Sequence, residues 1–300
     1  MNDQLYQHVY SNLQYQHDEV LEKFVEALKA EYKKSLLGVV FYGSCMRTRE
    51  YKDAMLDFYV IVDEYNHAYN SRWYSIANRV LPPNVFYLQV KISGQHYHSK
   101  YAVISMPGLY SAVNESFHPY FWARFTQPLS LVYFADENLK SRVTEIQCTA
   151  ATTFVNAVKD CIKEEFSSEA LWVKGLQLTY SAELRTETKQ RASVIYNSQS
   201  EFYDGITAAI FSQKRDYIST DKRRLLSTIK WKTRAFAGKI LSVLRLMKAT
   251  TTFTNGVDYI AWKIERHTGE PVIVSDRLRK HPLIFCWPLL LKFYKQGKIR

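Results

Sequence analysis

The chain has 300 residues, 47% of them hydrophobic and 15% aromatic, with only 10 Gly, 8 Pro and a net charge of +11. This composition predicts a folded protein and excludes a disordered chain or one with long flexible linkers. The length exceeds what most single hydrophobic cores use, so we expect two domains, or one domain with an appendage. The four cysteines are scattered and form no C-x-x-C pair, which indicates an intracellular protein with reduced thiols and no structural zinc.

Residues 3–34 read as two helices, because apolar residues recur at helical spacing with charges between them, most clearly over residues 20–28. We expect these positions to make core contacts only. The first 18 residues are polar and mixed in charge, unlike a secretory signal or a transit peptide.

Residues 38–63 predict a strand, a tight turn, a short helix and a second strand. The two apolar runs in this stretch are rich in β-branched and aromatic residues. Gly43 allows the backbone to approach a ligand, and Ser44 stands where a helix would begin, so hydroxyl and amide donors could point together at a phosphate. Asp57 lies in the second strand, where packing does not call for a carboxylate.

This pattern has two interpretations. Gly43 and Ser44 could form an ordinary turn, with Asp57 an edge-strand acid facing water. Alternatively, the stretch is a nucleotidyltransferase core, in which a Gly-Ser turn holds a nucleotide triphosphate and acids on the next strand hold magnesium. Acids two residues apart on a strand can share a metal, but the partner position here is Tyr59. A second carboxylate must then come from elsewhere, or the site is inactive.

Three further elements follow in the next part of the chain. We expect a helix over residues 70–79, which Pro82-Pro83 ends. Strands are predicted over residues 85–92 and 101–106 from their apolar and β-branched content.

Several polar side chains in this region are candidates for a site. His96 and His98 have no carboxylate or cysteine close in sequence, so we expect no metal there. Lys100 enters the second of these strands. Residues 115–134 predict an aromatic helix and then an apolar strand, and Arg124 is the one full charge in the apolar stretch after Glu115. A buried arginine needs an anion or a carboxylate, so Arg124 is either half of a structural ion pair or a phosphate ligand.

From about residue 146 to 215 the pattern is helical throughout, which suggests a second, α-rich unit.

The positive charge is concentrated at the end of the chain. Residues 222–300 contain 18 Lys and Arg against 4 Asp and Glu, whereas residues 1–221 contain 22 and 25. This asymmetry predicts an anionic partner, either nucleic acid or an acidic membrane surface. Residues 231–248 mix apolar and basic side chains at near-helical spacing, and residues 281–300 place an apolar run beside four basic residues. An apolar face with basic flanks suits interfacial binding, although the terminal run could instead pack on the protein. The apolar run, residues 282–291, is about half as long as the ~20 residues that a membrane-spanning helix needs.

Six short motifs occur in a fixed order. They are FYGS at Phe41–Ser44, MLDF at Met55–Phe58, NSRWYS at Asn70–Ser75, KYAVIS at Lys100–Ser105, WARFTQPL at Trp122–Leu129 and LTYSAELR at Leu178–Arg185. Over residues 38–265 the chain resembles the mitochondrial-type phosphatidate cytidylyltransferases, also called mitochondrial translocator assembly and maintenance proteins. That family also has a single Asp followed by Phe in its second strand, so Tyr59 does not depart from it.

The resemblance implies a source for the missing carboxylate. The family's LSY-x-GD-x-R segment resembles LTYSAELR, which places Glu183 at its aspartate and Arg185 at its arginine. Asp57, Glu183 and Lys100 are thereby implied as catalytic residues, with Mg²⁺ on Asp57 and Glu183. The implied nucleotide and phosphate ligands are Tyr42, Gly43, Ser44, Asn70, Arg124 and Arg185.

The resemblance also implies the fold and the reaction. The fold is α+β: a nucleotidyltransferase domain with a mixed sheet over residues 1–145, an α-rich, winged-helix-like domain over 146–225 that completes the active site, and a basic helical region over 226–300 for membrane contact. The reaction transfers CMP from CTP to phosphatidic acid and gives CDP-diacylglycerol and pyrophosphate, a step of phospholipid and cardiolipin biosynthesis. The implied location is intracellular, on the cytoplasmic face of a membrane, or on the matrix face of the mitochondrial inner membrane in a eukaryote.

Three positions depart from the family. Cys45 and Ala182 replace glycines, and Gln127 replaces a lysine after Arg124, which weakens a phosphate clamp there. Tyr59, Cys45 and Gln127 leave a catalytically inactive relative as one alternative. A nucleotidyltransferase-like protein that acts on or binds RNA is another, since phosphate contacts would explain the basic C-terminal part. It leaves the apolar terminal run unexplained, so nucleic acid is the less expected partner.

Overall fold

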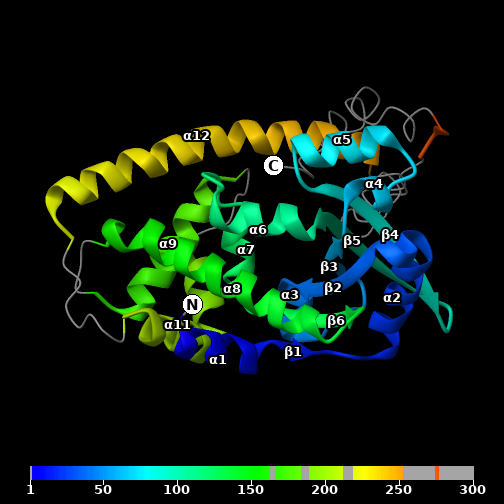
Figure 1. Cartoon of the computed structure of the whole chain (residues 1–300), viewed down its shortest axis with the longest axis horizontal. Coiled ribbons are helices and arrows are strands. Elements are labelled where there is room, and N and C mark those ends of the chain that lie inside the picture. Colours follow the sequence, from blue (N-terminus) through cyan, green and yellow to red (C-terminus); the bar gives the residue numbers. More distant parts are fainter. Residues whose placement is uncertain (1, 163–165, 184–188, 212–218, 253–273, 277–300) are drawn as a thin grey trace, which may run out of the picture.

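The computed structural model describes residues 2–162, 166–183, 189–211, 219–252 and 274–276. In this part of the chain a six-stranded sheet has helices on both faces, and one long helix, α12 (Asp221–Thr252), runs along the length of the molecule (Figure 1). The sheet contains both parallel and antiparallel neighbours. The predicted α+β fold with a mixed sheet is therefore confirmed.

The strand order of the sheet places β3 at its centre. The strands are β1 (Gln14–Tyr15), β2 (Leu36–Tyr42), β3 (Met55–Val62), β4 (Asn84–Ile92), β5 (Gln95–Ser105) and β6 (Ser130–Phe134). Their order is β1-β6-β2-β3-β5-β4, and β3 pairs antiparallel with β2 and parallel with β5. A side chain on β3 therefore has neighbours on both β2 and β5.

The two faces of the sheet have different covers. Side chains of β3 alternate between them, so that Phe58 belongs to one core and Tyr59 to the other. The core around Phe58 lies under α2 (Glu19–Tyr32), which buries Phe24 and Leu28 against it. The core around Tyr59 is larger and contains residues of the helical second half, among them Trp172. Asp57 is two residues from Tyr59 on the same strand, so its side chain points to the same face of the sheet, which these later helices cover.

The remaining helices complete the two layers. They are α1 (Asp3–Asn12), α3 (Ser44–Thr48), α4 (Tyr65–Ala68), α5 (Arg72–Val80), α6 (Met106–Asn114), α7 (Trp122–Phe125), α8 (Asn138–Val158), α9 (Ser168–Ser181), α10 (Lys189–Asn197) and α11 (Ser200–Phe211), with 3₁₀ turns at Lys33–Ser35 and Lys159–Cys161. The N-terminus of α2 is capped by the Asp18 carboxylate, which accepts from the amide of Leu21. The two helices predicted over residues 3–34 are thus confirmed as α1 and α2.

Three elements differ from the sequence predictions. β5 begins at Gln95 and not near residue 101, because Ser93 and Gly94 both have positive φ, 50° and 84°, and form a tight turn that pairs β4 with β5 at once. The aromatic helix expected from residue 115 shortens to the four residues of α7, since Pro119 interrupts the segment before it. α6 was not predicted.

The helix-rich part begins earlier than predicted. α8 starts at Asn138, so the expected boundary between residues 145 and 146 falls inside this helix. One hydrophobic core joins Tyr59 of the sheet to Phe154 of α8 and Trp172 of α9. The division of the chain into three domains stays a prediction.

The C-terminal part is described only as far as α12 and three later residues. α12 confirms the helix predicted over residues 231–248. Residues 281–300, with the apolar terminal run, lie outside the described residues. In the described part of the chain, no helix combines the length and apolar character that a membrane crossing requires.

Candidate active site

The turn after β2 brings the backbone against a carboxylate. Gly43 follows the last residue of β2 with φ of +87°, and α3 begins at the next residue, Ser44, which is exposed. A Cβ added to Gly43 would lie 2.8 Å from Oδ2 of Asp57, closer than real Cβ atoms come to other atoms. Both the conformation and the contact require glycine. The strand, turn, short helix and strand predicted over residues 38–63 are confirmed.

Asp57 and Lys100 are cross-strand neighbours. The parallel register of β3 and β5 places them opposite one another, and Nζ of Lys100 lies 3.1 Å from Oδ1 of Asp57. Tyr42 is the partner of Asp57 on β2. The Asp57 side chain is 19% exposed and that of Lys100 is 47% exposed. The sheet therefore presents a carboxylate and an ammonium group at the same place, beside the Gly43 backbone, with access to solvent.

The partly buried Tyr42 and the buried Tyr59 lie behind this group. The rings of Tyr42 and Tyr59 stack with centroids 4.7 Å apart, and Tyr59 also contacts Phe125. Burial raises the pKa of both phenols well above the ordinary value. They stay protonated at neutral pH. The position where a second strand acid would stand is thus occupied by a core side chain.

Glu183 forms a bidentate ion pair with Arg124. Nη1 and Nη2 of Arg124 lie 2.6 and 2.8 Å from the two carboxylate oxygens of Glu183, and the side chains are 11% and 10% exposed. Nη1 also donates to the carbonyl of Tyr120. Burial alone would lower the pKa of the guanidinium, but the Glu183 carboxylate raises it well above its ordinary value. Of the two alternatives for Arg124, the structure contains the ion pair, and a phosphate contact stays a prediction.

The predicted magnesium ligands each have a basic partner. Asp57 faces Lys100, and Glu183 is held by Arg124. Among the described residues, no three His, Cys, Asp or Glu side chains gather closely enough to hold a metal ion. If Glu183 turned to a metal it would leave a buried guanidinium unpaired, which is costly. The geometry fits a metal ligand at Asp57 better than at Glu183, and a Mg²⁺ shared by both stays a prediction.

One predicted site residue, Asn70, is not part of this group. Asn70 lines a different cavity, of about 710 Å³, together with Asp63 at the far end of β3. Asp63 lies six residue steps beyond Asp57 along the extended chain, or about 20 Å. Arg185 lies outside the described residues. Cys45, a position that departs from the family, is buried and its thiol donates to the carbonyl of Met55.

α12 contributes a charged side chain near the site that the sequence pattern did not predict. The guanidinium of Arg245 lies 4.1 Å from the ring centroid of Tyr120, and that of Arg124 lies 3.9 Å from the same ring. α12 can lie this close to the Ala182 backbone because Gly238 has no side chain. A Cβ at position 238 would lie 2.1 Å from the carbonyl oxygen of Ala182. A lone glycine in a long helix was the available signal.

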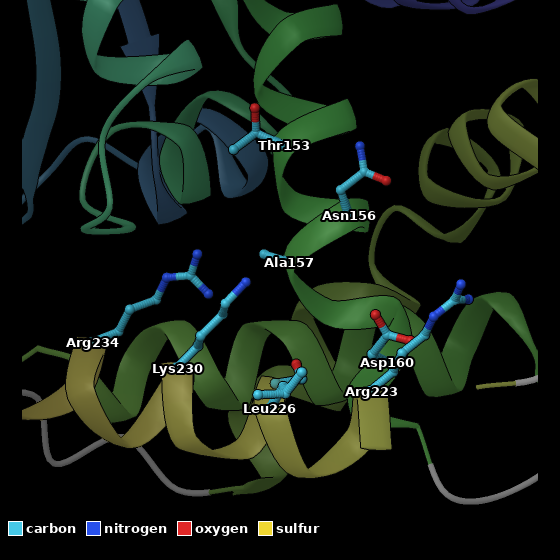
Figure 2. A pocket seen from close by; sticks show the side chains of 9 residues that line it. Thr153, Asn156, Ala157, Asp160, Arg223, Leu226, Lys230 and Arg234 are labelled. Carbon is cyan, nitrogen blue, oxygen red and sulfur yellow. The ribbon is translucent and has the colours of Figure 1, made fainter. Parts of the chain in front are cut away.

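A second groove lies between α8 and α12. Its volume is about 440 Å³. Lys230 and Arg234 of α12 extend side by side, across from Thr153 and Asn156 of α8 (Figure 2). The side of α12 that faces α8 is therefore basic.

Comparison with known proteins gives a distant structural neighbour. No family model and no curated protein matches the chain. The chain is similar to a nucleotidyltransferase-like protein from Exiguobacterium sibiricum 255-15, known from a crystal structure, with a TM-score of 0.27 and 8% sequence identity over 93% of this chain and 92% of that chain.

Proposed function

We propose that this chain is a magnesium-dependent nucleotidyltransferase that transfers CMP from CTP to phosphatidic acid. The observation that carries the nucleotidyl transfer is the contact of the Gly43 backbone with Asp57, with Lys100 in register beside it. A glycine turn, a carboxylate and an ammonium group at one partly exposed place suit a nucleotide triphosphate and its metal ion. The acceptor and the nucleotide come from the resemblance to phosphatidate cytidylyltransferases.

The proposed reaction does not require a general base. The attacking atom is a phosphate oxygen that is already ionised near neutral pH, so catalysis depends on positioning and on neutralising charge. The backbone at Gly43 and the hydroxyl of Ser44 would hold the nucleotide phosphates, and Lys100 would neutralise charge on them. Asp57 would hold Mg²⁺, which supplies further charge neutralisation when bound. Arg124 and Glu183 would fix the wall of the site through their ion pair.

The outer side of α12 supports contact with an anionic membrane surface, where a lipid acceptor would be reached. Its exposed apolar residues are Leu225, Ile229, Phe236, Ile240, Val243, Leu244, Leu246 and Met247. Exposed basic residues, Lys222, Lys232 and Lys239, lie among them. Apolar side chains enter the headgroup boundary while basic ones bind anionic lipids, at about 1 kcal/mol each. The protein would then act as a peripheral enzyme on the cytoplasmic face.

The test is conversion of radiolabelled CTP into a lipid-extractable product by the full chain, with phosphatidic acid vesicles and magnesium. We expect labelled CDP-diacylglycerol from the wild type, none from Asp57→Ala, and wild-type rates from Glu50→Ala, which removes an exposed acid. Glu183→Ala distinguishes two roles of Glu183. If Glu183 is only a metal ligand, the variant loses turnover and keeps its stability. If Glu183 is a structural partner of Arg124, the variant is less stable as well.

Two outcomes would overturn parts of the proposal. A wild type that binds CTP but makes no lipid product would rule out phosphatidic acid as acceptor, and RNA oligonucleotides would be tested next. A correctly folded wild type that fails to bind CTP in the presence of magnesium would rule out the nucleotidyltransferase.

A further inference from the structure

A cavity of about 570 Å³ lies between α6, the residues that follow α5, and α12. Its lining includes the buried His118, the partly buried Tyr120 and Arg245, and the aliphatic Leu241 of α12. Exposed charged residues of both signs, Glu64, Arg79 and Glu115, also line it. None of the predicted site residues that the structure describes lines this cavity.

The guanidinium of Arg245 is incompletely satisfied in this cavity. Nε donates to the carbonyl of Pro82 at 2.9 Å, and the planar group lies over the ring of Tyr120. Nη1 is buried, and among the described residues it has no hydrogen-bond acceptor. A buried donor without an acceptor is unfavourable, and such groups in folded proteins call for a specific explanation.

The positive charge of Arg245 is also unmatched. Arg124, on the same tyrosine ring, has the Glu183 carboxylate as its counterion. In the part of the chain that the structure describes, no Asp or Glu lies within ion-pair distance of Arg245. Its neighbour Lys248 donates to the carbonyl of Pro83, and burial together with the positive charge of Arg245 lowers the pKa of Lys248 to about 7. Burial lowers the pKa of Arg245, but an arginine does not lose its proton near neutral pH.

We propose that this cavity binds a phosphomonoester and that the guanidinium of Arg245 holds its phosphate. A doubly charged phosphate supplies both the acceptor for Nη1 and the missing counterion, and the fork of a guanidinium matches its geometry. The volume falls in the range of small-molecule sites, so there is room for an organic group beside the phosphate. The carboxylates of Glu64 and Glu115 disfavour a second anionic group, which selects a monoester over a nucleoside triphosphate.

The phosphomonoester site is inferred from the contacts of Arg245 and does not depend on the proposed transfer of CMP. A phosphomonoester could reach it as a free metabolite or as the headgroup of a lipid, and phosphatidic acid has this chemistry. Glycerol 3-phosphate and dihexanoyl phosphatidic acid, which is water-soluble, distinguish the two sources. Both can be tested without CTP, so a failure of the proposed transfer leaves this test unaffected.

The experiment is calorimetric titration of the full chain with each compound, for the wild type and for Arg245→Gln, Arg245→Lys and Arg223→Ala. We expect the wild type to bind at least one compound, Arg245→Gln to lose at least tenfold in affinity, and Arg245→Lys to recover part of it. Arg223→Ala removes an exposed arginine of the same helix that lines the other groove, and should bind as the wild type does. Binding of both compounds identifies the free phosphate ester as sufficient, and binding of dihexanoyl phosphatidic acid alone identifies the lipid.

A second measurement covers the case in which the Arg245 variants do not fold. Hydrogen exchange of the wild type, with and without the bound compound, should show slower exchange over residues 79–83 and 241–248. The proposal is overturned if neither compound binds, if Arg223→Ala and Arg245→Gln weaken binding equally, or if protection appears only elsewhere.

Discussion

The backbone of Gly43 leaves no room for a side chain beside the carboxylate of Asp57: a Cβ added at Gly43 would lie 2.8 Å from Oδ2 of Asp57 and 3.5 Å from its Cβ. The contact joins the turn after β2 to the middle of the candidate site. Any side chain at position 43 must push the Asp57 carboxylate aside, and the φ of +87° adds backbone strain to this clash.

We therefore expect Gly43→Ala to lower the free energy of unfolding by about 1–3 kcal/mol and to weaken CTP binding at least tenfold. Urea denaturation and calorimetric titration with CTP and magnesium measure the two effects. Gly94→Ala is a matched control, because Gly94 has a φ of +84° but an added Cβ would meet no atom within 4 Å. It should lose stability and keep its CTP affinity. Equal loss of CTP binding in both variants would contradict the role given to the Gly43 contact.

The Arg124–Glu183 pair should show strong energetic coupling. Both side chains are nearly buried, so Arg124→Met or Glu183→Gln alone leaves one group without its partner and should cost about 3–5 kcal/mol. The double variant should cost less than the sum of the two, by about 1–3 kcal/mol. Urea denaturation of the four proteins gives the cycle. Additive losses would show that the pair does not stabilise the fold as a unit.

The strand and turn around Gly43 could be predicted from the sequence because their signals are local. Apolar runs, Gly43 and Ser44 lie within a few residues of each other, and the structure confirms the succession. The pairing of Asp57 with Lys100 could not be derived in this way. It depends on the parallel register of β3 and β5, which is set by long-range packing and by the β4–β5 turn.

Other parts of the site depend on contacts between distant segments. Arg124 and Glu183 are 59 residues apart, and the sequence could say only that a buried arginine needs a partner. The inward direction of Arg245 was missed because both sides of α12 mix apolar and basic residues, so the helical pattern does not select the side that packs. Asn70 was placed with Asp57 by its motif, whereas the fold puts it at the other end of β3.

His118 should make stability depend on pH. Burial and the nearby Arg245 lower its pKa from 6.5 to about 4, against smaller opposing effects of the Ala182 carbonyl and Glu183. Between these pH values the unfolded chain binds the proton and the folded chain does not, so stability is lost as pH falls from 6.5 towards 4. The contribution is at most about 1.4 kcal/mol per pH unit.

Thermal unfolding of His118→Gln between pH 4 and 7 checks this expectation. The variant should lose part of the pH dependence of the wild type, while His96→Gln, at an exposed position, should keep it. If His118→Gln kept the wild-type dependence of stability on pH, that dependence would come from other titratable groups.

Gly238 should be required for α12 to lie against the rest of the molecule. An added Cβ would lie 2.1 Å from the carbonyl oxygen of Ala182 and 2.3 Å from Nε2 of His118, and the backbone carbonyl cannot move away easily. In an exposed helix, Gly→Ala stabilises by about 1 kcal/mol. We expect Gly238→Ala to destabilise by about 1–3 kcal/mol instead, as overpacking does, and to speed hydrogen exchange in α12. Lys239→Ala, at the exposed neighbouring position, should do neither. A stabilised Gly238→Ala would mean that α12 does not pack on Ala182, and the Arg245 cavity would lose the wall that α12 gives it.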